Sequence, residues 1–435
     1  MNIAILGAGN IARAMATTLQ PLKGVTCYAV AARDIKRAQI FADKFGFVKA
    51  YGSYVDMLED PEVELVYIAT PHSHHYEHIK MCLNANKHVL CEKAFTANAR
   101  QAEEVLRLAE SKGLLLTEAM WTRYMPMRQK IVDVVNSGII GKPTSLSANL
   151  GYPLEHRSRL YMPELCGGAL LDLGCYVLNF ASMVFGNEIT GMTANCVKYD
   201  TGVDAQETIM LTYADGKMAS LYVTMLAQTD RRGFIHGTNG YIEIENINNY
   251  ESIRVFNLER KVVAEYAAPI QVTGYEYEVQ SAMRAINEGQ IECPEMTHYD
   301  TLFMMQLMDN IRAAWGIKYP YDVERVDSDP EEDPVITARK LAEEERRKKE
   351  EERLKQIEER AKKAQQDKEE REKREAEALK LKQEMERKTS SETVKKIEDT
   401  DDKESAEDNE DNEDNEDVVK VKLSDGIEGL RKPKK

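Results

Sequence analysis

Apolar positions divide the first 120 residues into short runs that alternate with amphipathic segments. Apolar residues three and four apart predict helices over residues 35–45 and 98–112. The short runs read as strands, and together with the helices they predict a doubly wound parallel sheet covered on both faces. These runs are Ile3–Leu6, Thr26–Ala31, Leu65–Ala69, His88–Cys91 and Leu114–Thr117.

From about residue 142 to residue 269, apolar and polar positions alternate with the period of a strand. Asp215-Gly216 and Asn239-Gly240 are typical of hairpin turns, so we expect a large, mainly antiparallel sheet in an α+β domain. The alternating segments are Asp204–Tyr213, Met218–Met225, Arg232–His236, Tyr241–Asn246 and Ile253–Asn257. The helices expected beside this sheet are residues 170–184, 275–287 and 300–315.

Charge separates the last hundred residues from the rest. The 435 residues carry 74 acidic and 58 basic side chains, a net charge of -16, and residues 331–435 alone hold 35 and 28 of them. The last aromatic residue is Tyr321. Beyond it, the chain lacks the apolar surface that would offset ordering entropy.

The charged tail divides again. Residues 331–390 hold 19 acidic and 19 basic side chains, many spaced Glu to Lys or Arg four residues apart, which stabilises a solvated helix. An apolar coiled-coil seam runs only from Leu354 to Ala364, so we favour an isolated charged helix over a coiled coil. Residues 391–435 are acidic and repetitive, and we expect them to be disordered.

The sequence therefore predicts an α/β protein in four parts. The parts are residues 1–120, the doubly wound domain; residues 121–325, the α+β domain; residues 326–390, the charged helix; and residues 391–435, the disordered acidic end.

Composition also argues against several classes of protein. No apolar run approaches the ~20 residues of a membrane-spanning helix, and the start lacks the features of a signal peptide. Seven scattered cysteines fit a reducing compartment better than a disulfide framework. The acidic total gives no reason to expect nucleic-acid binding. We expect a cytoplasmic protein that binds neither membrane nor nucleic acid.

A dinucleotide-binding fingerprint, G-x-G-x-x-A, follows the first predicted strand directly. Gly7 permits a tight turn, Gly9 lets the backbone approach a pyrophosphate, and Ala12 allows the helix to pack closely on the strand. The helix N-terminus at Asn10 and Ile11 then presents free N–H groups to the phosphates.

The end of the second strand favours NADP. NAD sites usually have an acidic residue there for the ribose 2′-hydroxyl, but here Ala32 is followed by Arg33, with Lys36 and Arg37 one turn on. A guanidinium suits a 2′-phosphate. Asp34 is the objection, since it could bind the ribose of NAD; we interpret it as the N-cap of the next helix.

Histidines gather after the third predicted strand. A metal site is the alternative reading, but only His74 and His78 form an i,i+4 pair, and no set of further ligands accompanies them. The segment lies where the nicotinamide half of a dinucleotide is expected. We therefore expect no metal. The residues assigned to cofactor binding here are Thr70, Pro71, His72 and His75.

These motifs, with residues 86–93 and 167–176, resemble the Gfo/Idh/MocA oxidoreductases, and most of all the branch of dimeric dihydrodiol dehydrogenases and NADP-linked D-xylose dehydrogenases. The resemblance covers residues 1–322, and the tail has no counterpart. In the family, the lysine of a Glu-Lys-Pro motif reaches the nicotinamide ribose and the reacting oxygen. Here the motif is Glu92-Lys93-Ala94, which keeps the lysine and loses the fixed φ of proline.

The second family motif, Asp-x-Gly-x followed by His or Tyr, reads Asp172 to Tyr176 here. Alcohol oxidation moves a hydride to nicotinamide C4 and a proton to a base. Tyrosine, with a pKa of ~10, is a poor base at neutral pH, and a nearby ammonium lowers that pKa. We expect Tyr176 to be the acid/base and Lys93 its electrostatic partner, with Asp172 orienting Lys93 or binding a substrate hydroxyl.

Substrate contacts are expected near the carboxyl edge of the first sheet. Trp121 suits a sugar ring or an arene diol, and Arg123 suits hydroxyls; the alternative is that both pack at the domain junction. Arg157, in a polar loop together with His156 and Arg159, is a further candidate.

The resemblance thus implies an NADP-dependent oxidoreductase, with NAD as an alternative, that acts on a hydroxyl of a sugar or a trans-dihydrodiol. It also implies a homodimer through the open face of the second sheet. The rival hypothesis is a non-catalytic dinucleotide-binding regulatory or scaffold protein whose tail binds an unknown protein. The retained Lys93 and Tyr176 favour the enzyme.

Overall fold

The computed structural model describes residues 1–154 and 156–322. These residues belong to one compact unit, which contains two sheets. The expected charged helix (residues 326–390), its coiled-coil alternative and the expected disordered end (residues 391–435) lie outside the described residues.

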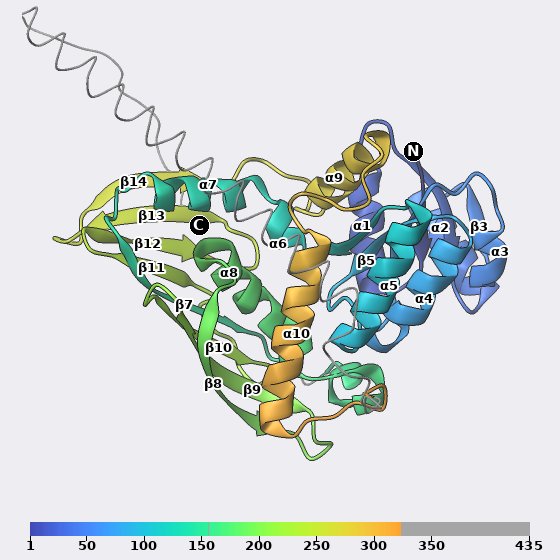
Figure 1. Cartoon of the computed structure of the whole chain (residues 1–435). Coiled ribbons are helices and arrows are strands. Elements are labelled where there is room, and N and C mark those ends of the chain that lie inside the picture. The colour runs from blue at the N-terminus through green and yellow to red at the C-terminus, as the bar shows by residue number, and fades with distance from the viewer. Residues whose placement is uncertain (155, 323–435) are drawn as a thin grey trace, which may run out of the picture. The chain divides into compact units, whose positions relative to one another are not determined.

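The first sheet has six parallel strands in the order β3-β2-β1-β4-β5-β6 (Figure 1). Its central strands are buried because helices cover both of its faces, which confirms the predicted doubly wound fold. The strands are β1 (Asn2–Leu6), β2 (Thr26–Ala31), β3 (Lys49–Tyr51), β4 (Leu65–Ile68), β5 (His88–Glu92) and β6 (Leu116–Ala119). The helices are α1 (Asn10–Leu19), α2 (Ile35–Phe45), α3 (Tyr54–Leu58), α4 (His72–Asn84) and α5 (Ala99–Lys112).

The strand order reverses between β1 and β4. β1 pairs in parallel with β2 on one side and with β4 on the other, so the chain leaves these strands toward opposite faces of the sheet. In open α/β sheets, ligands bind in the crevice outside the carboxyl ends of the strands at such a point. A ligand-binding site is therefore expected at the loops after β1, β4 and β5.

The second sheet has eight strands in the order β14-β13-β12-β11-β7-β10-β9-β8. All neighbours are antiparallel except β7 and β10, so the sheet is mainly antiparallel, as predicted. The strands are β7 (Pro143–Gly151), β8 (Ile189–Lys198), β9 (Asp204–Tyr213), β10 (Met218–Thr224), β11 (Gly233–Gly237), β12 (Gly240–Glu245), β13 (Ser252–Asn257) and β14 (Val262–Ala267). The helices of this half are α6 (Trp121–Tyr124), α7 (Pro126–Asn136), α8 (Cys175–Phe185), α9 (Glu276–Asn287) and α10 (His298–Trp315).

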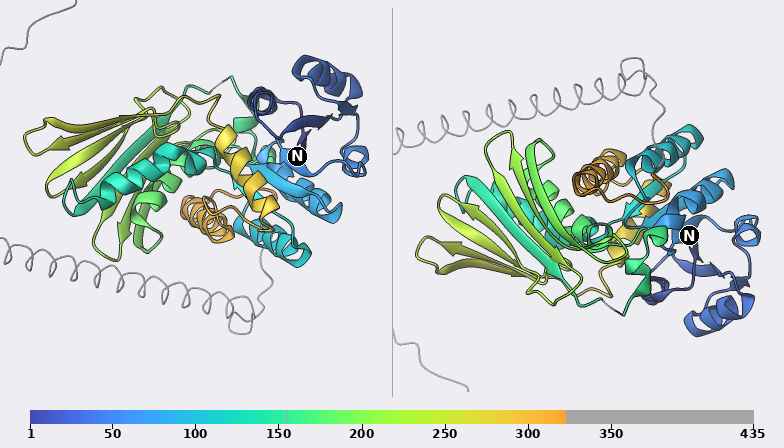
Figure 2. Two further views of the ribbon diagram at one scale, coloured as in Figure 1. Left: turned by 90° about the horizontal axis from the view of Figure 1, so that it is seen from above. Right: turned by 90° about the horizontal axis from the view of Figure 1, so that it is seen from below.

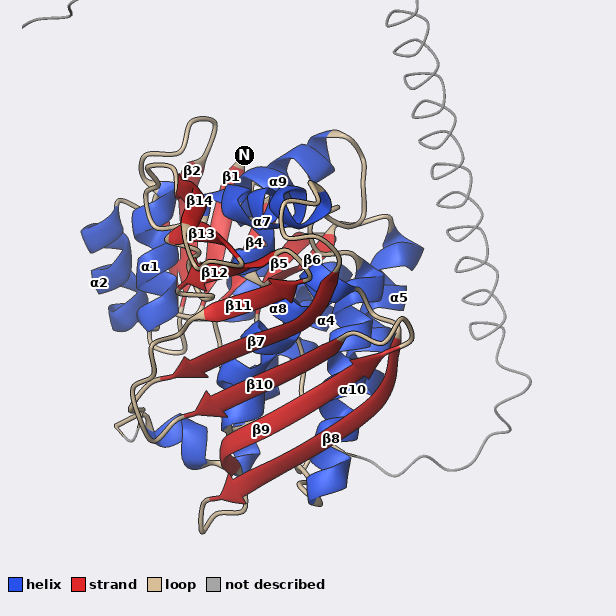
Figure 3. Cartoon of the chain, turned by 90° about the vertical axis from the view of Figure 1, so that its left-hand side faces the viewer, coloured by secondary structure: helices blue, strands red, loops and turns tan. Residues whose placement is uncertain are grey.

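Helices cover one face of the second sheet. Helix α8 packs on β7 and β10, and α10 packs against α5, α8 and β8, so it joins the two halves of the unit. Helices α9 and α10 lie between the second sheet and the first domain in both views of Figure 2. Figure 3 looks onto the other face of the sheet, across which no described helix runs.

The segment before and within α8 is the most apolar part of the fold. Three short turns lead into it: η1 (Ser158–Tyr161), η2 (Pro163–Leu165) and the π-helical η3 (Leu170–Gly174). Contrary to expectation, the stretch Pro163–Phe185 is long and apolar enough to cross a membrane by length and composition alone. However, 83 % of its most apolar window is buried inside the unit, which is the pattern of a core helix.

Candidate active site

The turn after β1 has the shape that a pyrophosphate requires. Gly7 has φ +105, and a Cβ at this position would lie 3.1 Å from the carbonyl oxygen of Ala69 in the loop after β4. Gly9 is the N-cap of α1, and neither a side-chain cap nor an acidic residue occupies the first turn of that helix. The N–H groups at Asn10 and Ile11 are therefore available to an anion, and the buried Ala12 lets α1 approach the sheet.

The two arginines after β2 differ in their surroundings. Asp34 Oδ1 accepts the backbone N–H of Lys36 at 2.9 Å, so Asp34 caps α2, as expected. Arg37 donates to the carbonyl oxygen of Ala8 at 2.9 Å and ties α2 to the glycine turn. Arg33 is exposed, and its charge adds to burial in lowering the pKa of His74. Arg37 is exposed as well, so both guanidiniums face solvent at this edge, and Arg37 is the one held by Ala8.

His75 connects the loops after β4 and β5. Its Nε2 lies 2.7 Å from the carbonyl oxygen of Thr70, which precedes Pro71 in the loop after β4. Its Nδ1 lies 2.9 Å from the carbonyl oxygen of Ala94 and 3.2 Å from that of Phe95, in the loop after β5. Burial lowers the pKa of His75 to about 4, although the three carbonyls act in the opposite direction. Because its ring is fully buried, His75 fixes the loop that carries Lys93, whose peptide bond to Ala94 is cis.

The histidines after β4 bond to separate partners rather than to one centre. His78 Nδ1 lies 3.0 Å from the hydroxyl of Thr70, and His72 Nδ1 lies 3.2 Å from the carbonyl oxygen of Cys166. Within residues 1–154 and 156–322, no three His, Cys, Asp or Glu side chains are gathered as a metal ion requires. These hydrogen bonds instead connect α4 to the loop after β4, through His78, and to Cys166, through His72.

Lys93 and Asp172 form the centre of the site. Lys93 Nζ donates to the backbone carbonyl oxygen of Asp172 at 2.6 Å and to its carboxylate Oδ1 at 3.3 Å. The same Oδ1 accepts Arg159 Nη2 at 2.9 Å and lies 4.0 Å from His72 Nε2. Burial alone would raise the pKa of Asp172, but Lys93 and Arg159 outweigh it and hold that pKa well below its usual range. Asp172 is therefore a buried anion between two cations.

Tyr176 lies beside this pair, in the first turn of α8. Lys93 Nζ is 5.0 Å from the centroid of its ring, and the tyrosine is 8 % exposed. No described residue hydrogen-bonds the Tyr176 hydroxyl. The expectation that Lys93 lowers the pKa of Tyr176 is not met here: burial, and then neighbouring groups that include Cys175 and Asp172, raise that pKa well above 10. The ammonium of Lys93 lies over the ring of Tyr176 and donates two hydrogen bonds to Asp172.

Buried acids lie behind the site. Glu92 is buried at the end of β5 and accepts a hydrogen bond from the hydroxyl of Tyr67. Burial raises the pKa of Glu92 to about 7 and that of Glu118 in β6 to about 7. Both oxygens of the buried Glu278 in α9 lack a partner among the described residues. Glu118 and Glu278 were not predicted as site residues; an acidic residue inside an apolar strand was the available signal for Glu118.

The residues predicted to bind substrate are placed differently from one another. Trp121 stacks on Tyr275 with 4.5 Å between the ring centroids, and its indole N–H is buried without a partner among the described residues. Arg123 is buried, and its guanidinium bonds to Asp300, Asn179 and the backbone of Glu295. All three partners belong to residues 121–325, so Arg123 is engaged inside the second half of the unit.

The polar loop before Gly167 places its second arginine, Arg159, in the site. Arg157, the predicted substrate residue, is exposed, and so is His156. Arg159 is the one that reaches inward, and it bonds to Asp172 while its side chain stays 36 % exposed. The spacing of the three basic residues in the sequence did not distinguish them.

Comparison with known proteins places both halves of the chain. Residues 1–120 match the family model described as oxidoreductase family, NAD-binding Rossmann fold, and residues 128–243 match the GFO/IDH/MocA C-terminal domain. A mouse trans-1,2-dihydrobenzene-1,2-diol dehydrogenase is 33 % identical over 329 residues, which are 73 % of this chain and 98 % of that protein. The bovine enzyme of the same name is 34 % identical over 327 residues, again 73 % of this chain and 98 % of the relative.

Solved structures agree with this placement. The 3-ketoreductase KijD10 from Actinomadura kijaniata, in complex with NADP and TDP-benzene, is 25 % identical, with a TM-score of 0.66 over 72 % of this chain and 97 % of that one. Solved variants of that ketoreductase replace one lysine and one tyrosine. A levoglucosan dehydrogenase in complex with NADH and L-sorbose, 19 % identical with a TM-score of 0.65 over 73 % of this chain and 96 % of that one, shares the fold.

Proposed function

This chain belongs to the Gfo/Idh/MocA oxidoreductase family, and we propose that it is an NADP-linked dehydrogenase in which Tyr176 is the acid/base. The substrate we propose is a hydroxyl of a sugar or of a trans-dihydrodiol, oxidised to the carbonyl and reduced in reverse. One observation carries this proposal: Lys93, at the carboxyl edge of the first sheet, meets Asp172 and Tyr176, which lie far from it in the sequence.

The residues present fit a phosphorylated dinucleotide. The glycine turn leaves room for backbone contact with the pyrophosphate, and the uncapped N-terminus of α1 supplies N–H donors. Arg33 is exposed where a 2′-phosphate would lie, whereas Asp34 is engaged as a helix cap and is a poor partner for a ribose hydroxyl. We therefore favour NADP over NAD.

The chemistry divides between the cofactor and the chain. A bound nicotinamide would supply the acceptor for the hydride that leaves the carbinol carbon. In the oxidation direction Tyr176 must first be ionised, and its phenolate oxygen then takes the hydroxyl proton; in the reverse direction the neutral phenol gives that proton to the carbonyl oxygen. Lys93 donates toward the reacting oxygen and stabilises its negative charge, while Asp172 holds the ammonium in place. Arg159 adds a second positive charge at the same carboxylate.

The protonation state of Tyr176 suggests which direction is easier. Because its pKa is raised well above 10, Tyr176 carries its proton at neutral pH. A neutral phenol is the form that donates to a carbonyl, so carbonyl reduction needs no prior ionisation. The 3-ketoreductase among the structural neighbours acts in that direction by name.

The relatives support the substrate class. The two named relatives are trans-1,2-dihydrobenzene-1,2-diol dehydrogenases, and the 3-ketoreductase KijD10, a structural neighbour, is solved with NADP and TDP-benzene. A screen of NADP reduction against pentoses, hexoses, inositols and arene dihydrodiols tests the proposal. Turnover with one of these classes supports it. Cofactor binding without turnover in any class would favour the rival regulatory function.

The dimer and the cellular location are part of the proposal. Met210, Met218 and Tyr222 are exposed on the face of the second sheet that no described helix covers, and Tyr241 stacks on Phe256 there. An exposed apolar face of this kind usually marks a protein contact, and we place the homodimer interface on it. We propose a cytoplasmic location.

For residues 331–435 we propose a tether that binds a protein partner and leaves the chemistry unchanged. Removal of these residues should then leave turnover intact; a large loss would show that they are part of the enzyme.

A further inference from the structure

Two carboxyl groups lie inside the second domain, behind the turn that carries Asp172. Asp204 begins β9 and is 0 % exposed, and Glu207 on the same strand is 2 % exposed. Asp204 Oδ2 accepts the backbone N–H of Leu170 at 2.5 Å. Leu170 is the first residue of η3, so Asp204 caps the segment that contains Asp172 and continues into α8 with Tyr176.

Three of the four oxygens of this pair lack a hydrogen-bond partner among the described residues, namely Oδ1 of Asp204 and both oxygens of Glu207. Each side chain acts on the pKa of the other. Two carboxylates have no donor between them, so a hydrogen bond within the pair requires a proton. Burial raises the pKa of both acids, and the charge of Asp204 raises that of Glu207 further, which favours the proton on Glu207. The N–H of Leu170 stabilises the charge on Asp204.

Two glycines of the motif leave the space that this pair occupies. Gly168 has φ +116, and a Cβ there would collide with Oδ1 of Asp204. A Cβ on Gly174 would lie 2.7 Å from Oε1 of Glu207, closer than real contacts allow. Both glycines flank Asp172 in the sequence. The segment from Gly168 to Tyr176 therefore needs these two glycines to leave room for Asp204 and Glu207.

We propose that Asp204 and Glu207 are positioning residues, which hold Asp172 and Tyr176 in register with Lys93 through the cap on η3. Neither acid touches the reacting atoms. The kinetic part of this proposal rests on the proposed function, while its structural part does not.

Other titratable groups face the pair from neighbouring elements. Cys196 on β8 acts on the pKa of Glu207, and Asp204 acts on the pKa of Tyr319 after α10. Burial raises the pKa of Cys196 and that of Tyr319, so both are neutral near pH 7. Near neutral pH, the groups in this region whose charge can change with pH are therefore Asp204 and Glu207.

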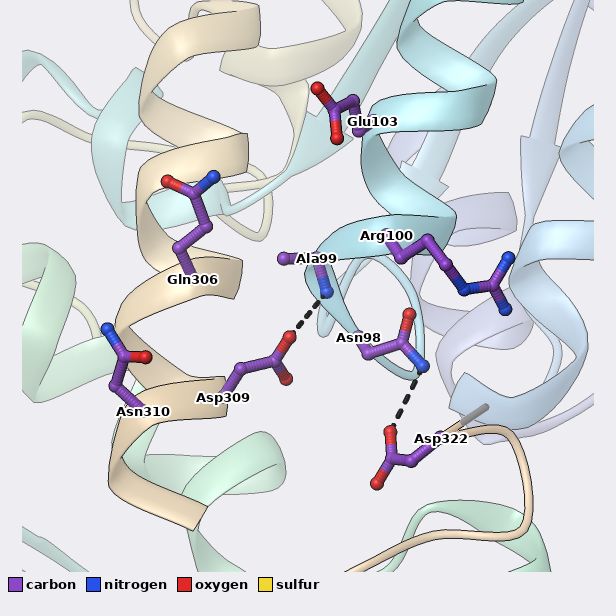
Figure 4. A pocket seen from close by; sticks show the side chains of 8 residues that line it. All are labelled: Asn98, Ala99, Arg100, Glu103, Gln306, Asp309, Asn310 and Asp322. Carbon is purple, nitrogen blue, oxygen red and sulfur yellow. Dashed lines mark hydrogen bonds between the residues drawn. The ribbon is translucent and has the colours of Figure 1, made fainter. Parts of the chain in front are cut away.

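Three variants test the proposal in the full chain. Asp204→Asn removes the anionic cap, and Glu207→Gln keeps a donor toward Asp204. Asp309→Asn is the matched control, because Asp309 Oδ2 accepts the backbone N–H of Ala99 at 2.7 Å and caps α5, a helix that carries no residue of the candidate site. Figure 4 shows this bond in a polar pocket between α5 and α10.

The kinetic result expected is a loss of kcat without a loss of cofactor affinity. A misplacement of ~1 Å costs up to about 100-fold, so Asp204→Asn should lower kcat by about 10- to 100-fold while the Kd for NADPH changes less than about twofold. Glu207→Gln should keep kcat within about twofold, and Asp309→Asn should lower Tm alone. If Asp204→Asn lowers Tm like the control and leaves kcat unchanged, or if Glu207→Gln is as slow as Asp204→Asn, the proposal is overturned.

A second measurement does not depend on turnover. Amide hydrogen exchange of residues 169–176 should be faster in Asp204→Asn than in the wild type, and unchanged in Glu207→Gln and Asp309→Asn. This result in a protein with no dehydrogenase activity would overturn the proposed function and support the cap. Unchanged exchange in Asp204→Asn would overturn the cap even in an active enzyme.

If Asp204→Asn does not fold, the pH dependence of Tm in the wild type and in Glu207→Gln still tests whether Glu207 holds a proton. A folded-state pKa raised above the unfolded value gives a stabilisation that is lost as pH rises. The Tm of the wild type should therefore fall relative to Glu207→Gln as pH rises from about 5 to about 9. Parallel Tm curves would overturn the assignment of a proton to Glu207.

Discussion

The ammonium of Lys93 bonds to Asp172 twice, at 2.6 Å to the backbone carbonyl and at 3.3 Å to the carboxylate. These contacts fix the distance between a loop of the first domain and the turn before α8 in the second. Tyr176 follows in the first turn of α8, with Lys93 Nζ 5.0 Å from its ring. The catalytic geometry that we propose is therefore a property of the junction between two sheets.

Asp172→Asn should separate the anchoring of Lys93 from the binding of the cofactor. The substitution leaves Lys93 and Arg159 without their shared anion, and the loss of one member of a buried charge cluster costs about 3 kcal/mol. We expect kcat to fall by about 10- to 100-fold with little change in the Kd for NADPH. Stopped-flow turnover and thermal unfolding measure the two effects. An unchanged kcat would show that Asp172 does not hold Lys93 for the reaction.

Arg33→Ala should weaken the binding of NADPH and leave the binding of NADH nearly unchanged. A hydrogen bond to a charged group contributes about 1.5–3 kcal/mol, which corresponds to about 10- to 150-fold in Kd. Nicotinamide fluorescence measures both affinities. Asp34→Ala is the control, because it removes the cap of α2 at a cost of about 1 kcal/mol and should leave the NADPH-to-NADH ratio as it is. Tighter binding of NADH by the wild type would contradict the role of Arg33.

The two directions of the reaction should respond differently to pH. Burial raises the pKa of Tyr176 well above 10, so the phenol is protonated throughout the neutral range. Reduction of the carbonyl uses that phenol and should be nearly flat between about pH 6 and 9. Oxidation needs the phenolate and should rise with pH, by up to about tenfold per unit. Initial rates in both directions measure this; an oxidation rate that levels off near neutral pH would mean that the pKa of Tyr176 is low in the working enzyme.

Glu118 should make the folded protein less stable as pH rises. Burial raises the pKa of Glu118 from 4.5 to about 7. The folded state therefore holds this proton more tightly than the unfolded state, and the stabilisation is complete below the unfolded pKa and is lost as pH rises through about 7.

Each pH unit in that window costs about 1.4 kcal/mol, so the whole effect is about 3 kcal/mol. Glu118→Gln should lack it. Urea unfolding of both proteins from about pH 5 to 8 measures the free energy of unfolding, and equal slopes against pH would show that Glu118 ionises normally.

The pattern of apolar residues located strands that are buried throughout and strands with one buried face, and it failed at the edges of the sheets. β2 and β9 begin and end where they were predicted. β3 and β14 are edge strands with partly exposed positions, so polar residues interrupt the expected period. β7 is central, but its outward positions are Ser, Thr and Asn, which are also typical of turns.

The site was predictable where a motif fixed a backbone shape. The glycine turn and the Asp34 cap follow from local rules, and both are present. The partners of Arg123 and the inward direction of Arg159 depend on segments distant in the sequence, which no local pattern encodes. The same holds for the pKa of Tyr176, because burial decides its direction more strongly than one neighbouring ammonium.

The most direct test of the account is the turnover of Lys93→Met and Tyr176→Phe beside the wild type, with NADP and the sugars and dihydrodiols of the screen. General acid–base catalysis contributes about 100- to 10,000-fold, so we expect both variants to lose at least about 100-fold in kcat. Tyr176→Phe should still bind NADPH within about twofold of the wild type, because the change touches neither the glycine turn nor Arg33 nor Lys93. A Tyr176→Phe variant that turns over as fast as the wild type would contradict the account.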